Sequence, residues 1–291
     1  MDSLLLALET SPAFWITACT LLGLLVGSFL NVVIYRLPVI LEREWQGQAR
    51  EILELAPEED QETFNLVTPR SRCRECDAPI TAAQNVPVFS YLFLAGKCRH
   101  CRAPISVRYP LIELLTGFLT GFTAWYFGFS FEAVGGFLLV WLLIAMTFID
   151  FDTQLLPDNL TLPLLWLGLL FSLGGAFATP TEAIIGAAAG YLSLWSIYHA
   201  FRLLTGKEGM GYGDFKLYAA LGAWMGWKVL PMIILLSAGA GAIIGGAMIL
   251  LAGHERQVPI PFGPFLAIAG LIAFFYGDNI LSWYLGLYAR P

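Results

Sequence analysis

The sequence predicts an all-α polytopic membrane protein, with about eight transmembrane helices and a small zinc-stapled cytoplasmic insert after the first helix. Of the 291 residues, 57% are hydrophobic and only 13% are charged, whereas a soluble globular chain carries about 25% charged residues. Apolar runs near the ~20 residues needed to cross a bilayer recur along most of the chain. These features exclude an ordinary soluble globular domain.

Eight apolar segments form the predicted spans. They are residues 12–35, 109–127, 132–150, 159–178, 183–203, 214–227, 230–252 and 262–286. The first span is not a signal peptide, because the preceding stretch MDSLLLALETSP holds acids and no basic side chain. By the positive-inside rule this acidic end faces outward. Threading eight spans from there leaves only Lys228 and Arg290, among all lysines and arginines, on the outer side.

Three parts follow from this arrangement. Residues 1–37 contain the first span and the motif at its end, residues 38–108 form a polar cytoplasmic insert, and residues 109–291 form a seven-span body. Two glycine-spaced stretches of the body, 174–190 and 237–253, are typical of membrane helices that approach one another closely.

Two CxxC pairs, CREC and CRHC, supply a staple for the insert, which is too short for a large core. Their four thiolates match a tetrahedral structural zinc site formed by Cys73, Cys76, Cys98 and Cys101. Disulfides are disfavoured on a cytoplasmic face. Redox cysteines and iron–sulfur ligation are the alternatives, and His100 could replace one thiolate.

Two aspartates lie at membrane depth, where an ionisable residue suggests function. Asp150 ends an apolar run, at a helix C-terminus whose dipole disfavours an anion. Asp214 begins the span 214–227 and is preceded by Gly211 and Gly213. An even number of spans separates the aspartates, so both lie on the cytoplasmic side. Two carboxylates that share one proton can activate water for peptide hydrolysis. The glycines would let an extended substrate approach the second acid.

The chain resembles the type IV prepilin peptidases, GxGD-type membrane aspartyl proteases of bacterial inner membranes. The resemblance rests on both CxxC pairs and on GSFLNVVIYRLP (27–38), ISVRYPLIELLTG (105–117), IDFDTQLLPD (149–158), GMGYGDFK (209–216) and PIPFGP (259–264). It implies a bifunctional enzyme that cleaves the basic leader of type IV prepilins and type II secretion pseudopilins on the cytoplasmic side. The enzyme then N-methylates the new terminus with S-adenosylmethionine. The implied partners are these substrates and the lipid bilayer, with no nucleic acid. The positive-inside rule and the eight spans described above would make both chain termini periplasmic.

The resemblance also implies site residues. It makes Asp150 and Asp214 the catalytic pair and assigns the amino-terminal portion, with its cysteine insert, to methyl transfer. Supporting residues of the peptidase motifs are Asp152, Asp158, Gly211, Gly213 and Lys216. From the residues alone, Asp158 after Pro157 is instead expected to be the N-cap of span 159–178.

The methyl-donor site has no Rossmann fingerprint. Motif matches suggest Asn31, Arg36, Gly96, Lys97 and Glu113. Structural alternatives are an interhelical hydrogen bond for Asn31, interfacial snorkelling for Arg36 and a buried arginine partner for Glu113.

Other classes of protein remain as alternatives. Intramembrane aspartates also line ion pathways in transporters and channels, although the inner spans here lack further ionisable residues for a relay. A non-catalytic assembly protein is a second alternative. The acid-rich segment 42–62 either steers basic leaders toward the site or is a solvated helix face.

Overall fold

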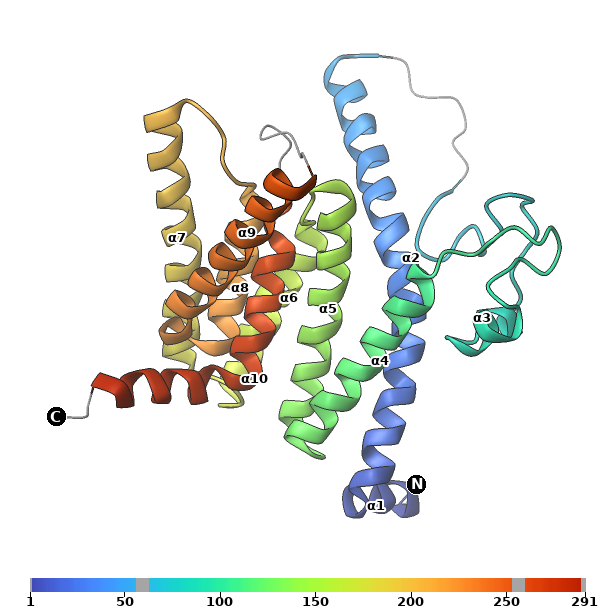
Figure 1. The fold of residues 1–291 in the computed structure, drawn as a ribbon, viewed down its shortest axis with the longest axis horizontal. Coiled ribbons are helices and arrows are strands. Elements are labelled where there is room, and N and C mark those ends of the chain that lie inside the picture. Colours follow the sequence, from blue (N-terminus) through green and yellow to red (C-terminus); the bar gives the residue numbers. More distant parts are fainter. Residues whose placement is uncertain (1, 56–62, 253–259, 289–291) are drawn as a thin grey trace. The chain divides into compact units, whose positions relative to one another are not determined.

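The computed structural model describes residues 2–55, 63–252 and 260–288 (Figure 1). The described part is helical and contains only isolated β-bridges, Arg72 with Pro79 and Lys97 with Pro104. The elements are α1 (Asp2–Thr10), α2 (Pro12–Ile52), η1 (Ala82–Asn85), α3 (Phe89–Phe93), α4 (Arg108–Phe127), α5 (Phe131–Thr153), α6 (Asp158–Leu173), α7 (Pro180–Thr205), α8 (Tyr212–Met225), η2 (Trp227–Val229), α9 (Leu230–Ala252) and α10 (Gly263–Tyr288).

The predicted all-helical fold is confirmed, and each expected span falls on one helix from α2 and α4 to α10. Within the described residues, five helices are long and apolar enough to cross a membrane: α2, α5, α7, α9 together with η2, and α10. Helices α6 and α8 have only 16 and 14 residues, about 24 and 21 Å at 1.5 Å per residue. Eight crossings, and the three-part division at residues 37 and 108, therefore stay predictions.

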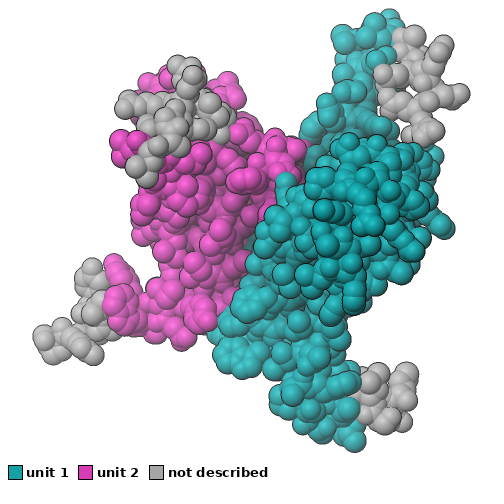
Figure 2. Space-filling model, turned by 45° about the vertical axis from the view of Figure 1, so that its right-hand side comes forward, with its two compact units in different colours: residues 1–145 teal, residues 146–291 magenta. Residues whose placement is uncertain are grey.

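The chain divides within α5 into two compact units, residues 1–145 and 146–291 (Figure 2). In the first unit α2 packs along α4. Their backbones nearly touch, because a Cβ on Gly27 would lie 2.7 Å from the Cα of Glu113. Cys19 of α2 packs with Ala133 and Phe137 in the apolar core of this unit.

Helix α2 extends well beyond the predicted end of its span at residue 35. It has 41 residues and continues through Pro38 to Ile52, so it is about 60 Å long. This is about twice the ~30 Å hydrocarbon thickness of a bilayer. The first residues assigned to the insert, 38–52, are thus a helical continuation of the membrane span, and the acids Glu42, Glu44 and Glu51 are exposed on it.

In the second unit α8 is the central helix, packed against α6, α7 and α10. Nearly every residue from Asp214 to Trp224 is buried. The contact with α7 depends on glycine, since a Cβ on Gly186 would lie 2.2 Å from the carbonyl oxygen of Gly222. Close approach is thereby confirmed for the stretch 174–190.

The second glycine-spaced stretch behaves differently. A Cβ on Gly239 or Gly246 would meet no atom of the described residues within 4 Å. By contrast, a Cβ on Gly245 would lie 3.1 Å from Ile260 and one on Gly241 would lie 3.7 Å from Phe265. The expectation of close packing is therefore wrong for Gly239 and Gly246, whereas Gly245 does have a close neighbour.

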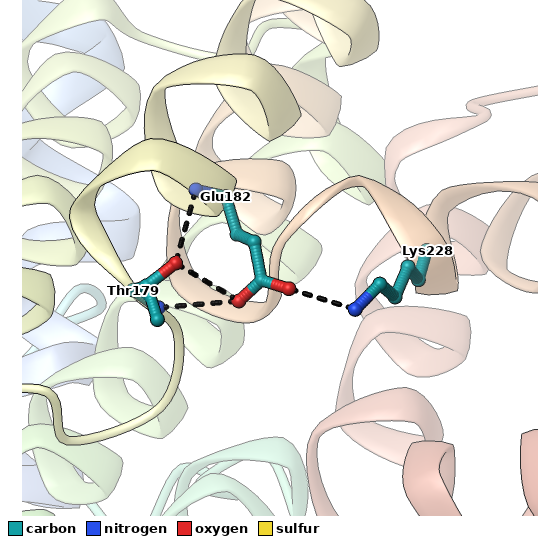
Figure 3. Close-up of polar contacts among 3 residues, drawn as sticks. All are labelled: Thr179, Glu182 and Lys228. Atoms are coloured by element: carbon teal, nitrogen blue, oxygen red, sulfur yellow. Dashed lines mark hydrogen bonds and ion pairs between the residues drawn. The ribbon is translucent and has the colours of Figure 1, made fainter.

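At the opposite end of α8 from Asp214, an ion pair joins α7 to η2 (Figure 3). Thr179 and Glu182 form a capping box at the start of α7. The second Glu182 oxygen accepts a hydrogen bond of 2.8 Å from Lys228 Nζ. This contact fixes the turn that follows α8 and so helps to define where that helix ends.

Candidate active site and metal site

Asp150 and Asp214 come together in the second unit. Asp150 lies in the last turn of α5 and Asp214 in the first turn of α8. Their exposed fractions are only 5% and 6%, and the carboxylates are close enough for the charge of one to act on the other. Two aspartates that are 64 positions apart in the sequence thus form one buried carboxylate pair.

Each carboxylate accepts a backbone hydrogen bond at the beginning of a helix. Asp214 Oδ2 accepts from the N–H of Gly211, the N-cap residue of α8, at 3.2 Å. Asp150 Oδ2 accepts from the N–H of Gly263, the first residue of α10, at 2.9 Å. A helix N-terminus stabilises a negative charge, so both acids lie in a favourable field. The sequence shows only the unfavourable end of α5 at Asp150, because the compensating helix begins 113 positions later.

Gly263 is a site residue that sequence reasoning missed. A Cβ at this position would lie 2.6 Å from Asp150 Oδ2 and 3.1 Å from Leu156. Only glycine lets the start of α10 approach the carboxylate this closely. The available signal was the motif PIPFGP, in which Gly263 lies between Phe262 and Pro264 at the beginning of a span.

The glycines of GMGYGDFK have different surroundings. A Cβ on Gly213 would lie 2.6 Å from Leu156 Cβ, so this glycine makes room for Leu156. Gly211 is exposed, and its Cβ would meet only Asp214 and the backbone nitrogen of Gly213. The expectation of an open approach for substrate therefore suits Gly211 and does not suit Gly213.

The assignment of Asp158 as an N-cap is wrong. Pro157 is the N-cap residue of α6, and Asp158 is already within the helix. Proline has no side-chain oxygen to accept a capping hydrogen bond. The Asp158 carboxylate instead accepts hydrogen bonds of 2.5 and 2.7 Å from Lys216 Nζ. This partly exposed ion pair connects the start of α6 to the start of α8, two residues after Asp214. Asp152 is exposed in the last turn of α5.

This arrangement has the parts of an acid–base pair. Two buried carboxylates lie near each other, and each has one oxygen that accepts a hydrogen bond from a backbone N–H. One ionised carboxylate can take a proton from water while its protonated neighbour gives one to a carbonyl oxygen. Transporter-type relays need further charged groups, and the other buried acidic or basic side chains of the described residues are Arg36 and Glu113, both in the first unit.

The four cysteines also come together, in the first unit. The sulfur atoms of Cys73, Cys76, Cys98 and Cys101 lie within 4.8 Å of one another. The distance from Cys73 Sγ to Cys101 Sγ is 3.8 Å. Four sulfurs bound at 2.3 Å around one tetrahedral zinc ion would be about 3.8 Å apart. The cluster has the donor set and the spacing of a closed four-thiolate metal site.

The two CxxC pairs have the same backbone conformation. Cys73 N–H donates to Ala78 and Cys98 N–H donates to Ala103, at 2.9 and 2.8 Å. The residue after each second cysteine, Asp77 or Arg102, has positive φ. The sequence signal for this equivalence is the repeat CRECDAPI and CRHCRAPI.

The residues suggested for the methyl donor have separate contacts. Asn31 Nδ2 donates to the carbonyl oxygen of Tyr109 at 3.1 Å, which is the interhelical bond considered as its alternative. Arg36 is buried and donates to the carbonyl oxygens of Asn65 and Pro69. The snorkelling alternative for Arg36 is therefore wrong, and this side chain holds the loop that follows α2.

Glu113 also has a backbone partner. Its Oε2 accepts a 2.7 Å hydrogen bond from Val88 N–H, so the alternative of an arginine partner is wrong. Gly96 has a φ of +67°, and a Cβ there would lie 2.9 Å from the Tyr91 hydroxyl. Lys97 is exposed beside the second CxxC pair. The assignment of these residues to a methyl donor stays a prediction.

Two family models match the chain. The bacterial peptidase A24 N-terminal domain matches residues 21–127, and the type IV leader peptidase family matches residues 137–246. No solved structure matches. Among curated proteins, the prepilin leader peptidase/N-methyltransferase of Stutzerimonas stutzeri is 56% identical over 96% of both chains. The protein of that name from Pseudomonas aeruginosa is 55% identical over 96% of both chains. The one from Neisseria gonorrhoeae is 50% identical over 96% of this chain and 97% of the relative.

Proposed function

Since the chain belongs to the type IV leader peptidase family, it is a membrane enzyme that cleaves prepilin leaders and N-methylates the product, and we propose that Asp150 and Asp214 catalyse the cleavage. The observation that carries this proposal is the meeting of the two buried carboxylates, each bound by a backbone N–H. Cleavage occurs on the cytoplasmic side of the bacterial inner membrane. Its substrates are type IV prepilins and type II secretion pseudopilins.

The mechanism needs one proton on the pair. The ionised carboxylate takes a proton from a water molecule, whose oxygen attacks the scissile carbonyl carbon. The protonated carboxyl group gives its proton to the carbonyl oxygen. When the resulting tetrahedral diol collapses, the C–N bond breaks and one diol hydroxyl returns its proton to the carboxylate that protonated the carbonyl oxygen. The proton collected from water goes to the leaving amine. The pair ends the cycle with one proton, as it began, and no metal takes part.

The orientation follows from the charge distribution. Both chain termini are periplasmic, and residues 38–108 are cytoplasmic, with the lysines and arginines concentrated on that side. The even number of helices between α5 and α8 is consistent with their acids sharing one membrane face.

The cysteine cluster binds one structural zinc ion through Cys73, Cys76, Cys98 and Cys101. Four thiolate donors at this spacing leave no open position for a substrate, so the ion stabilises the insert. S-adenosylmethionine is the methyl donor. The residues proposed for it are Gly96 and Lys97, with Asn31, Arg36 and Glu113 supporting the surrounding backbone.

The test uses Asp150→Asn and Asp214→Asn, in the full-length protein in detergent, with separate prepilin and mature pilin substrates. Both changes keep the shape of the side chain and remove its acid–base function, so leader cleavage should be lost while methylation of mature pilin persists. Asp278→Asn is the matched control, because it makes the same replacement at an exposed carboxylate on α10. Substantial cleavage by either site variant would refute the assignment.

A further inference from the structure

Helix α3 of the insert exposes large apolar side chains to its surroundings. Three of them, Phe89, Leu92 and Phe93, together with Val86 just before the helix, form what we call the α3 patch. Phe93 is 87% exposed, and a cavity of about 270 Å³ separates the patch from η1. Exposed apolar groups gathered in this way mark a contact surface.

A partly buried hydrogen bond fixes the position of the α3 patch along α4. The N–H of Val88, the residue before α3, donates to Glu113 Oε2 at 2.7 Å. Val88 has a φ of +62°, which is unusual for a β-branched residue, so this bond holds the chain in a strained turn. Glu113 lies five residues after the start of α4 at Arg108, about 7.5 Å along the helix axis.

That depth corresponds to the edge of a bilayer. The polar layer on each side of the hydrocarbon core is about 5–8 Å thick, so a helix that enters at Arg108 reaches the hydrocarbon boundary near Glu113. Figure 1 shows α3 level with the first turns of α4. At the same level α4 exposes Leu111, Leu114 and Leu115, as a lipid-facing helix would. The α3 patch continues this apolar surface.

Three cations lie beside the patch. Lys97, Arg99 and Arg102 are exposed, and they line a cavity of about 180 Å³ together with Phe93. No acidic side chain in the described part of the chain pairs with them. Apolar side chains next to unpaired cations have the chemistry of a segment that lies in the interface of an anionic membrane.

We propose that the α3 patch inserts into the cytoplasmic leaflet, and that Arg99 and Arg102 bind the phosphates of anionic phospholipids. The insert is then a surface-bound domain, with its second CxxC pair against the membrane. This contact is separate from leader cleavage and methylation.

The first experiment measures the depth of Phe93 in full-length protein in lipid nanodiscs. 4-Trifluoromethylphenylalanine replaces Phe93, and the ¹⁹F signal is recorded with a nitroxide on the lipid chains or with a water-soluble paramagnetic chelate. The lipid nitroxide should broaden the signal several-fold more than the chelate. The same label at Val67, which is 80% exposed in the same unit, should show the reverse order.

Two results would overturn the membrane contact. In one, the label at position 93 responds as the label at position 67 does. In the other, it is shielded from the chelate only after a prepilin-derived apolar peptide is added, which would make the patch a substrate-docking surface.

The second experiment tests the cations with Arg99→Gln/Arg102→Gln. The control is Arg72→Gln/Arg74→Gln in the first CxxC pair, where Arg72 already pairs with Asp77 and Arg74 already stacks on Tyr35. A nitroxide on the headgroup of phosphatidylglycerol should broaden the Phe93 label more than one on phosphatidylcholine. This preference should disappear in the first variant and persist in the control, with the metal content of both unchanged. An equal preference in the first variant would remove the cationic part of the proposal.

Discussion

The close approach of α10 to Asp150 makes Gly263→Ala a sharp test of the active site. The added Cβ would lie 2.6 Å from Asp150 Oδ2, whereas ordinary contact begins at 3.4 Å, so the two groups must separate by about 0.8 Å. A misplacement of about 1 Å at a catalytic group costs about 10²-fold in rate. We therefore expect leader cleavage to fall about 100-fold.

The same change should leave most of the protein intact. Overpacking costs about 1–3 kcal/mol of stability, which a membrane protein of several packed helices should tolerate. Methylation of mature pilin should remain near the wild-type rate, since the pair of aspartates has no part in it. The loss should appear in kcat more than in KM, because the substrate-binding surface is unchanged.

The assay compares initial rates of leader removal from a synthetic prepilin in detergent. Gly246→Ala is the matched control, because its Cβ would meet no atom of the described residues within 4 Å. It adds the same methyl group and should cleave at the wild-type rate. If Gly263→Ala retains cleavage within about threefold of wild type, the contact between Gly263 and Asp150 does not position the carboxylate.

Three further changes test other contacts. Cys76→Ser should abolish stoichiometric zinc and make the insert sensitive to protease, since structural zinc contributes folding free energy of the order of 10 kcal/mol; elemental analysis that finds no metal in the wild-type protein would contradict this. Lys216→Met and Asp158→Asn should each lower cleavage only a few-fold, with a coupling energy below about 1 kcal/mol in a double-mutant cycle, because the ion pair is partly exposed. Neutralising Glu42, Glu44, Glu51 and Glu54 should raise the KM for prepilin at low salt and have little effect at high salt; an unchanged low-salt KM would show that these acids form only a solvated helix face.

The sequence predicts the spans well because a membrane helix must be long and apolar, and both properties are local. The far end of α2 was missed for the same reason. Residues 42–52 are polar and leave the membrane, so hydropathy does not reveal that Glu42, Arg43 and Arg50 continue the helix. Helix propensity supports such a continuation, and Pro38 does not break it.

The sequence predicts which acids form the site, but it does not predict which groups form hydrogen bonds with them. Asp150 and Asp214 stand out because an acid in an apolar run is costly unless it is used. The partners of these acids follow no local rule. The N–H of Gly263 donates to Asp150, 113 positions earlier in the sequence. Lys216 pairs with Asp158, 58 positions earlier, so that Asp158 does not cap α6 as expected. The buried Glu113 likewise binds a backbone N–H that the sequence cannot assign to it.

The bond from Gly263 to Asp150 also bears on the order in which the enzyme is made. The donor is the first residue of α10, the last helix of the described chain. A ribosome that has delivered α1 to α9 to the membrane has therefore produced both aspartates without the group that holds one of them. Nascent chains arrested before α10 should show no leader cleavage. Adding this helix as a separate peptide should restore cleavage, so the onset of protease activity is timed to the insertion of α10.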